Sequence, residues 1–156
     1  MENNNTLSQP KSLRILFLTE MWERFSYYGM RALLVLYLVQ SQGYSAFEAM
    51  HIYAIYTGLV YLTPVIGGYL ADHYLGQQKS ILIGGITMMF GHLFMANPST
   101  LNLALGLLII GNGFFKPNIS SLLGGFYLTN DARRDGGYSF FYVGINMGAF
   151  IAPLLI

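Results

Sequence analysis

Five long apolar stretches, separated by short polar connections, limit what this chain can fold into. A helix needs roughly 20 mostly apolar residues to cross a bilayer. The apolar stretches cover residues 12–40, 46–74, 80–96, 101–128 and 137–156. Residues 1–11 are polar and are expected to form a cytoplasmic N-terminal tail. The pattern predicts an all-α transmembrane protein with about five membrane-spanning helices, the last of which is still apolar where the sequence stops.

The composition agrees with a membrane protein and excludes several other classes. Only 10% of the residues are charged, whereas soluble domains carry about 25%. The 18 glycines suit helices that pack closely in a bilayer. A net charge of +1 gives no support for nucleic-acid binding, and the absence of cysteine excludes a disulfide framework. The three histidines have no metal-ligand spacing, so no metal site is expected.

The cationic residues near the ends of the apolar stretches predict the orientation of the chain in the membrane. If the five stretches alternate in direction, all of these cations lie on the same side: Lys11, Arg14, Lys79, Arg133 and Arg134. Cytoplasmic loops carry an excess of Lys and Arg. The N-terminus is therefore predicted to be cytoplasmic, in the inner membrane of a cell. Chance scatter of these residues is the alternative.

The first apolar stretch carries a stripe of polar side chains. Glu20, Glu23, Arg24, Tyr27 and Arg31 fall within roughly 60° of one line on a helix. A charge at the centre of a membrane helix costs about 2.5 to 3.5 kcal/mol, so these groups are expected to pair and to face a wet interior. Glu20 and Arg24 form a favourable i,i+4 pair. Carboxylates in such a site are suited to carrying protons; a salt-bridged packing element is the alternative.

A further cation lies well inside the fourth stretch. Lys116 is preceded by Asn112 and followed by Pro117, and loosened helices near the bilayer midplane are recurrent binding sites in secondary transporters. Snorkelling of the lysine to an interface is the alternative. Three intramembrane cations (Arg24, Arg31 and Lys116) face two acids, which leaves one positive charge unanswered. An anionic ligand group, or an acid outside this segment, is expected to balance it.

The second stretch ends in a short motif that includes an acid and a lysine. Residues 68–79 read G-x-x-x-D-x-x-x-G-x-x-K, which places Asp72 and Lys79 on the two sides of Gly76. This pattern is typical of gating loops in major facilitator transporters. A simple capped helix end is the alternative.

Four sequence motifs, taken together, resemble one family. They are EMWERFSYYG at 20–29, GGYLADHYLG at 67–76, GNGFFKPNIS at 111–120 and RRDGGYSFFYVGINMGAFIAP at 133–153. In this order they are similar to the proton-dependent oligopeptide transporters of the major facilitator superfamily. The resemblance covers nearly the whole chain after residue 12. It implies that residues 12–156 form the N-terminal part of a major facilitator helical bundle, incomplete at its C-terminus.

The resemblance also implies roles for individual residues. Proton coupling is assigned to Glu20, Glu23 and Arg24. Peptide binding is assigned to Arg24, Tyr27, Tyr28, Tyr61, Lys116 and Asn146. Gating is assigned to Arg31, Asp72 and Lys79. Mammalian members have a helix-2 histidine where this chain has Ala54, so the resemblance implies a bacterial type of arrangement.

The leading hypothesis is a proton symporter for di- and tripeptides, with protons as the coupling ion and no other cofactor. Its expected partners are a small peptide, membrane lipid and the missing C-terminal bundle. One alternative is a transporter of another small solute, such as nitrate or a small acid, on the same fold. Another is a non-transporting fragment. Enzyme activity is not expected, because G-x-S-x-G, H-E-x-x-H and the P-loop motif are absent from the sequence.

Overall fold

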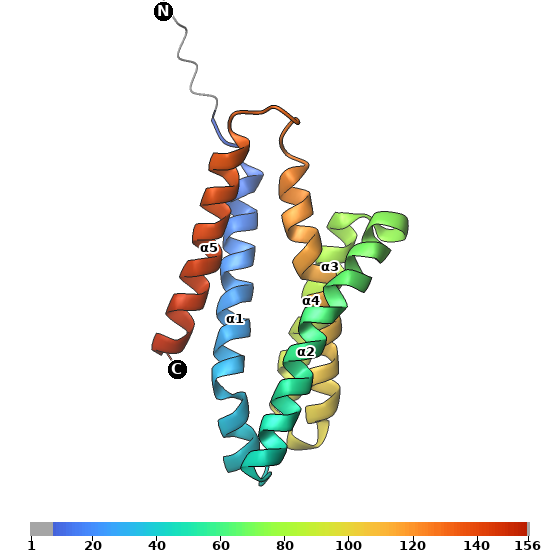
Figure 1. Ribbon diagram of the computed structural model, residues 1–156, viewed down its shortest axis with the longest axis vertical. Helices are drawn as coiled ribbons and strands as arrows, with labels where there is room; N and C mark the ends of the chain where they lie inside the picture. The colour runs from blue at the N-terminus through green and yellow to red at the C-terminus, as the bar shows by residue number, and fades with distance from the viewer. Residues whose placement is uncertain (1–7, 156) are drawn as a thin grey trace, which may run out of the picture. The chain divides into compact units, whose positions relative to one another are not determined.

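The computed structural model describes residues 8–155 and shows a chain of helices joined by short connections (Figure 1). Five α-helices and two short helical segments follow one another in the described range. In chain order they are α1 Ser12–Gln40, α2 Ala46–Leu70, the π-helix η1 Ala71–Leu75, α3 Gln77–Met95, the 3-10 helix η2 Pro98–Thr100, α4 Leu101–Gly124 and α5 Arg134–Leu155. No strand occurs among these residues, and the all-α prediction is confirmed.

Several helix ends differ from the sequence-based expectation. The helix predicted over 46–74 changes to a π-helical turn at Ala71, and α3 begins at Gln77 rather than at residue 80. Helix α4 ends at Gly124 rather than at 128, and α5 begins at Arg134 rather than at 137. Apolar composition marks the part of a helix that suits lipid, whereas hydrogen bonding sets its ends, and polar residues such as Gln77 and Arg134 are good helix formers.

Local signals explain how some of these helices begin and end. The hydroxyl of Ser45 accepts a hydrogen bond from the Glu48 amide at 3.3 Å, and the Ser45 amide donates to the Glu48 carboxylate at 2.9 Å. This reciprocal capping box starts α2. Gly76, at φ 77°, ends the π-helix, and its amide donates to the Ala71 carbonyl at 2.8 Å. A left-handed backbone of this kind favours glycine.

The chain divides into two compact units. Among the described residues, the first unit comprises those up to Ala32 and those from Leu123 onward, and the second comprises residues 33–122. In the first unit, α5 runs parallel to the first part of α1, with Gly144 against Phe17 and Gly148 against Met21.

In the second unit, α4 packs against both α2 and α3 through glycines. A Cβ atom at Gly67 on α2 would overlap the carbonyl oxygen of Gly113 on α4. A Cβ atom at Gly84 on α3 would lie 2.6 Å from the carbonyl oxygen of Gly111. The Thr63 hydroxyl also donates to the Ile109 carbonyl at 3.0 Å. Such close contacts need glycine, so backbone-to-backbone packing explains the glycines at these positions.

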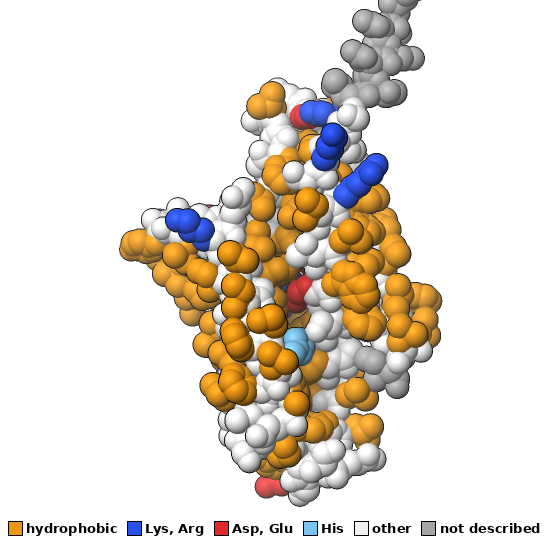
Figure 2. Space-filling view, turned by 180° about the vertical axis from the view of Figure 1, so that it is seen from behind, with side chains coloured by type: hydrophobic (Ala, Val, Ile, Leu, Met, Phe, Trp, Pro, Cys, Tyr) orange, Lys and Arg blue, Asp and Glu red, His pale blue; other side chains and the backbone are white. Residues whose placement is uncertain are grey.

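Large apolar side chains are exposed along the helices, as expected for surfaces that face lipid. Figure 2 shows hydrophobic side chains spread over the visible face with few charged ones between them. Examples are Trp22, Val65, Leu82 and Phe150, with exposed fractions of 61%, 71%, 64% and 69%. Three helical segments in the described range are long and apolar enough to cross a membrane: Ala46–Leu75, Pro98–Gly124 and Arg134–Leu155. The helices α1, with its charges, and α3, with its polar first turn, fall outside this set.

Candidate functional site

The charged stripe of α1 forms a compact ion cluster in the first unit. The Arg24 guanidinium pairs with Glu23 through Nε and Oε2, and through Nη2 and Oε1 at 2.6 Å. The Nε atom also lies 3.4 Å from Oε1 of Glu20. Arg24 and Glu20 are each 3% exposed, and the Glu23 side chain is 8% exposed. One guanidinium thus forms ion pairs with two carboxylates in a site that excludes most water.

The division of contacts within this cluster differs from the simplest helical expectation. Residues at i and i+4 lie on the same helix face, whereas neighbours normally diverge. In the structure, the adjacent Glu23 makes the two close bonds to Arg24, and the i,i+4 pair with Glu20 is longer. Both side chains are long enough to bend toward one another, so the guanidinium fork faces both oxygens of Glu23. The predicted Glu20–Arg24 pair is nevertheless present.

Aromatic side chains extend the cluster along α1. The Arg24 guanidinium carbon lies 5.0 Å from the centre of the Tyr27 ring, which is a cation–π distance. Tyr27 is 6% exposed and meets Tyr28 edge to face, with ring centres 5.2 Å apart. Arg31 is half-buried one turn further along α1. Four of the five stripe residues, namely Glu20, Glu23, Arg24 and Tyr27, therefore form one connected group.

Asn146, the remaining predicted site residue of the first unit, lies on α5. Its side chain is exposed on α5, between the two glycines that contact α1. The exposed amide is open to a ligand or to another part of the protein.

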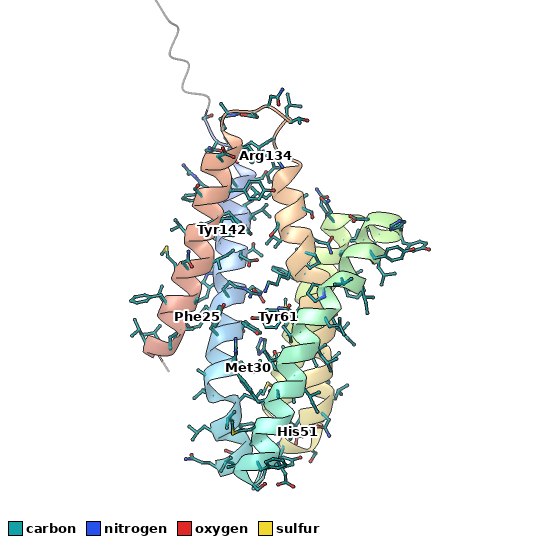
Figure 3. All side chains as sticks on the ribbon, viewed as in Figure 1. Phe25, Met30, His51, Tyr61, Arg134 and Tyr142 are labelled. Carbon is teal, nitrogen blue, oxygen red and sulfur yellow. The ribbon has the colours of Figure 1, made fainter. Side chains whose placement is uncertain are left out.

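The second unit brings two further predicted residues together. The Lys116 ammonium lies 5.3 Å from the centre of the Tyr61 ring, so the lysine on α4 faces the tyrosine on α2. Tyr61 comes from the middle of α2 (Figure 3) and is 59% exposed. Lys116 is half-buried. It lies on α4, which the contact between Gly113 and Gly67 holds close to α2. An ammonium beside an exposed tyrosine can bind a carboxylate and a polar backbone at once.

Two asparagines and a proline accompany Lys116 on α4. Asn112 and Asn118 are 2% and 1% exposed, and the Asn118 amide donates to the Phe114 carbonyl at 2.7 Å. Pro117 lies within the helix and faces Gly68 on α2, where an added Cβ would lie 3.5 Å from the proline Cβ. Proline cannot donate a hydrogen bond to the carbonyl four residues earlier, at Gly113; the Asn118 side chain bonds to a different carbonyl, that of Phe114.

The predicted gating residues lie at the end of α2. Asp72 is in the π-helical turn, and Lys79 is in the first turn of α3; both side chains are exposed. No sequence pattern predicted a π-helix here, although π-helical turns are frequent at functional sites. Next to Asp72, the His73 ring nitrogen lies 2.9 Å from the Tyr69 carbonyl oxygen.

Sequence reasoning missed a polar cluster that fixes the start of the described chain. The Tyr127 hydroxyl donates to the Gln9 side-chain oxygen at 2.8 Å, and the Gln9 amide donates to the Arg133 carbonyl at 3.1 Å. Arg133 in turn donates to the Ser8 carbonyl at 2.9 Å and pairs with Asp131 at 2.7 Å. Hydrogen bonds from Arg133 lower the pKa of Asp131 to about 2. The bonds of Ser8 and Gln9 join residues more than a hundred positions apart, so no local pattern could reveal them; the Asp131–Arg133 pair is local.

No group of three or more histidine and acidic side chains in residues 8–155 is arranged to hold a metal ion. The histidines lie in separate places instead. His51, near the start of α2 (Figure 3), stacks on Phe47 with ring centres 6.5 Å apart. The His73 ring lies beside the Tyr69 ring, with ring centres 4.2 Å apart.

Comparisons with known proteins agree with the motifs. The sequence model of the POT family matches residues 78–156. The di-/tripeptide transporter of Lactococcus lactis subsp. lactis (strain IL1403) is 49% identical over 95% of this chain and 32% of its own length. The chain thus spans about a third of the curated relatives that it matches.

Solved structures agree in fold as well. A peptide transporter POT mutant in complex with alafosfalin is 46% identical, with a TM-score of 0.91 over 95% of this chain and 32% of the other. A POT family transporter in complex with 5-aminolevulinic acid is 37% identical, with a TM-score of 0.91. That match covers 96% of this chain and 32% of the other chain. With its spanning helices, its motifs and the family match, this membrane protein belongs to the POT family.

Proposed function

We propose that this chain forms the N-terminal part of a proton-coupled symporter for di- and tripeptides. The observation that carries the proposal is the buried cluster in which Arg24 answers both Glu20 and Glu23. The cluster holds two nearly buried carboxylates against one guanidinium, which places groups able to bind a proton inside the protein. That is the property required of a proton carrier. The Lactococcus relative, at 49% identity, is named a di-/tripeptide transporter.

The substrate class is supported by the balance of charge. Lys116 faces Tyr61 in the second unit, and the intramembrane cations exceed the acids by one. A peptide carboxylate would neutralise that surplus, and its backbone amides would bond to tyrosine hydroxyls. In this proposal Arg24, Tyr27, Tyr28, Tyr61, Lys116 and Asn146 contact the peptide. Arg31, Asp72 and Lys79 act in gating.

The remaining parts of the proposal concern the setting of the protein. The proton is the coupling ion, no other cofactor takes part, and the protein carries out transport without enzymatic chemistry. It lies in the inner membrane with a cytoplasmic N-terminus, because the cations of the connecting loops fall on one side. A second helical bundle would complete the transporter, since the relatives are about three times as long as this chain.

Peptide uptake in proteoliposomes tests this function. The protein, expressed from its own gene, is reconstituted and supplied with labelled dialanine under an inward proton gradient. We expect accumulation that an ionophore abolishes. Glu20→Gln, Glu23→Gln and Lys116→Ala should reduce it at least about tenfold, because each removes a group that the transport cycle requires. Glu48→Gln is the matched control, since Glu48 caps α2 at the exposed end and glutamine preserves the capping box.

Uptake that ignores the proton gradient would contradict the symport mechanism. The small-acid alternative is supported by the relative solved with 5-aminolevulinic acid. It would be favoured if that acid competed with the label while no dipeptide did. A native mass near 17.4 kDa together with no uptake would favour a non-transporting role.

A further inference from the structure

Helix α5 lies against α1 through two glycines, and one of them meets the turn that carries the ion cluster. A Cβ atom at Gly148 would overlap the carbonyl oxygen of Met21 and would lie 3.0 Å from both the Arg24 Cβ and the Phe25 amide nitrogen. Two of these three neighbours are backbone atoms, which cannot rotate away. Gly148 is buried, so any side chain there would have to push the two helices apart.

The contact falls at a particular point on α1. Met21 directly follows Glu20, and Arg24 lies one turn along the helix. The carbonyl of Met21 and the stem of Arg24 are therefore the parts of α1 that set where Glu20, Glu23 and the guanidinium point. Arg24 is 3% exposed, and its guanidinium reaches both acids. A displacement of the helix axis at this turn would change distances that are short and directional.

We infer that Gly148 is a positioning residue for proton coupling: it sets the approach of α5 to α1 and so fixes the geometry of the Glu20–Arg24–Glu23 cluster. This inference rests on the proposed function. Gly148 touches neither proton nor peptide and acts through Arg24 and the Met21 backbone. Misplacement of a reacting group by about 1 Å can reduce a rate roughly a hundredfold. A single added methyl group on α5 is thus expected to disturb coupling from outside the cluster.

Gly144 supplies the comparison that separates positioning from packing. It lies one turn earlier on the same face of α5, and a Cβ there would lie 2.9 Å from the Phe17 ring and 3.0 Å from the Phe17 carbonyl oxygen. Phe17 stacks on Phe140 with ring centres 4.5 Å apart, and neither side chain ionises. Substitution of Gly144 therefore also forces α1 and α5 apart, but at a turn that carries apolar side chains and not the ion cluster.

The test compares Gly148→Ala with Gly144→Ala in the protein expressed from its own gene, at equal amounts of folded, reconstituted protein. We expect Gly148→Ala to lower gradient-driven dialanine uptake roughly tenfold and to shift the pH midpoint of uptake by about half a unit or more. Gly144→Ala should keep the wild-type pH midpoint. Gly106→Ala serves as the open-space control, since no atom lies within 4 Å of a Cβ there. A wild-type pH midpoint in Gly148→Ala, or an equal shift in Gly144→Ala, would overturn the inference.

A second measurement keeps the inference testable if the wild type transports no peptide, which would refute the proposed function alone. Thermal unfolding in detergent is recorded for Gly148→Ala, Glu20→Gln and the double variant, with Gly144→Ala in a parallel cycle. Residues that share an environment give non-additive effects, whereas distant ones add. The Tm shifts of Gly148→Ala and Glu20→Gln should be non-additive in the double variant. The Tm shifts of Gly144→Ala and Glu20→Gln should be additive. Additivity in both cycles would refute the positioning role of Gly148. If Gly148→Ala does not fold, the same measurements are made with Ala152→Gly added. Ala152 lies one turn further along the same buried face of α5, and its replacement by glycine gives the helix pair room to accept the new methyl group.

Discussion

Arg24 shows at the scale of one residue why the chemistry of a side chain matters beyond its charge. The guanidinium is planar and presents several donors in a fixed fork, so it can hold both oxygens of Glu23 while it remains near Glu20. The periodicity of the sequence predicted the common face and the Glu20–Arg24 pair. It could not predict that Glu23 takes the two close bonds, since that depends on rotamers chosen by packing.

Replacement of Arg24 by lysine tests the fork while it preserves the charge. A lysine ammonium cannot bond to two carboxylates with the same geometry, which leaves a buried oxygen without its donor. Arg24→Lys should lower the free energy of unfolding by about 1 to 3 kcal/mol and should reduce proton-driven uptake. Thermal unfolding in detergent and uptake at matched pH provide the measurements. Arg134→Lys, at an exposed position in the first turn of α5, is the control and should stay within about 0.5 kcal/mol of wild type. Equal effects of the two substitutions would contradict the role of the fork.

At the scale of elements, the start of the described chain is tied to the connection between α4 and α5. Ser8 and Gln9 bond to Arg133 and Tyr127, and Asp131 holds the Arg133 side chain in place. Sequence reasoning used Arg133 only as a marker of membrane orientation. Hydropathy located all five helices, but their ends and this tie depend on hydrogen bonds. A π-helical turn at Ala71–Leu75 is likewise set by packing and not by local propensity.

The tie predicts a pH-dependent release of the N-terminal segment. The pKa of Asp131 is lowered from 3.8 to about 2 by its bonds to Arg133. The stabilisation is therefore fully present above about pH 4 and is lost as the pH falls through about 2. Because the sequence has no cysteine, a spin label on Ser8→Cys reports this region alone. We expect an immobilised label at neutral pH and a mobile one near pH 2.

Asn in place of Asp131 should free the label at every pH, because an amide cannot form the charged pair. Asp135→Asn is the matched control, since Asp135 is exposed in the first turn of α5. A label that stays immobile in Asp131→Asn would show that the remaining bonds of Gln9 and Tyr127 suffice.

At the scale of the whole molecule, the proposed orientation requires helices that alternate in direction, so that successive connections would lie on opposite sides of the membrane. Parallel contacts between α1 and α5, and between α2 and α4, agree with that alternation. The family resemblance read from four motifs is confirmed by the match of residues 78–156 to the POT family. The roles of individual residues remain predictions, because a motif identifies a family while the path of a peptide depends on both halves of a transporter.

The proposed orientation predicts which connections a reagent can reach from outside. In intact cells, an impermeant maleimide should label Ser99→Cys in the 3-10 segment between α3 and α4, and it should leave Ser8→Cys unlabelled until the cells are opened. In the proposed orientation, the cations Lys11 and Arg14 would hold the N-terminal end at the cytoplasmic side. Labelling of Ser8→Cys in sealed cells would reverse the orientation.

The glycine contacts of α4 have a mechanical consequence. Where backbone meets backbone, as at Gly67 with Gly113 and at Gly84 with Gly111, attraction falls steeply with separation. Such joints are stiff. The stretch of α4 that carries Lys116 and the neighbouring parts of α2 and α3 should therefore move together, so that a displacement of any of these helices also displaces the lysine.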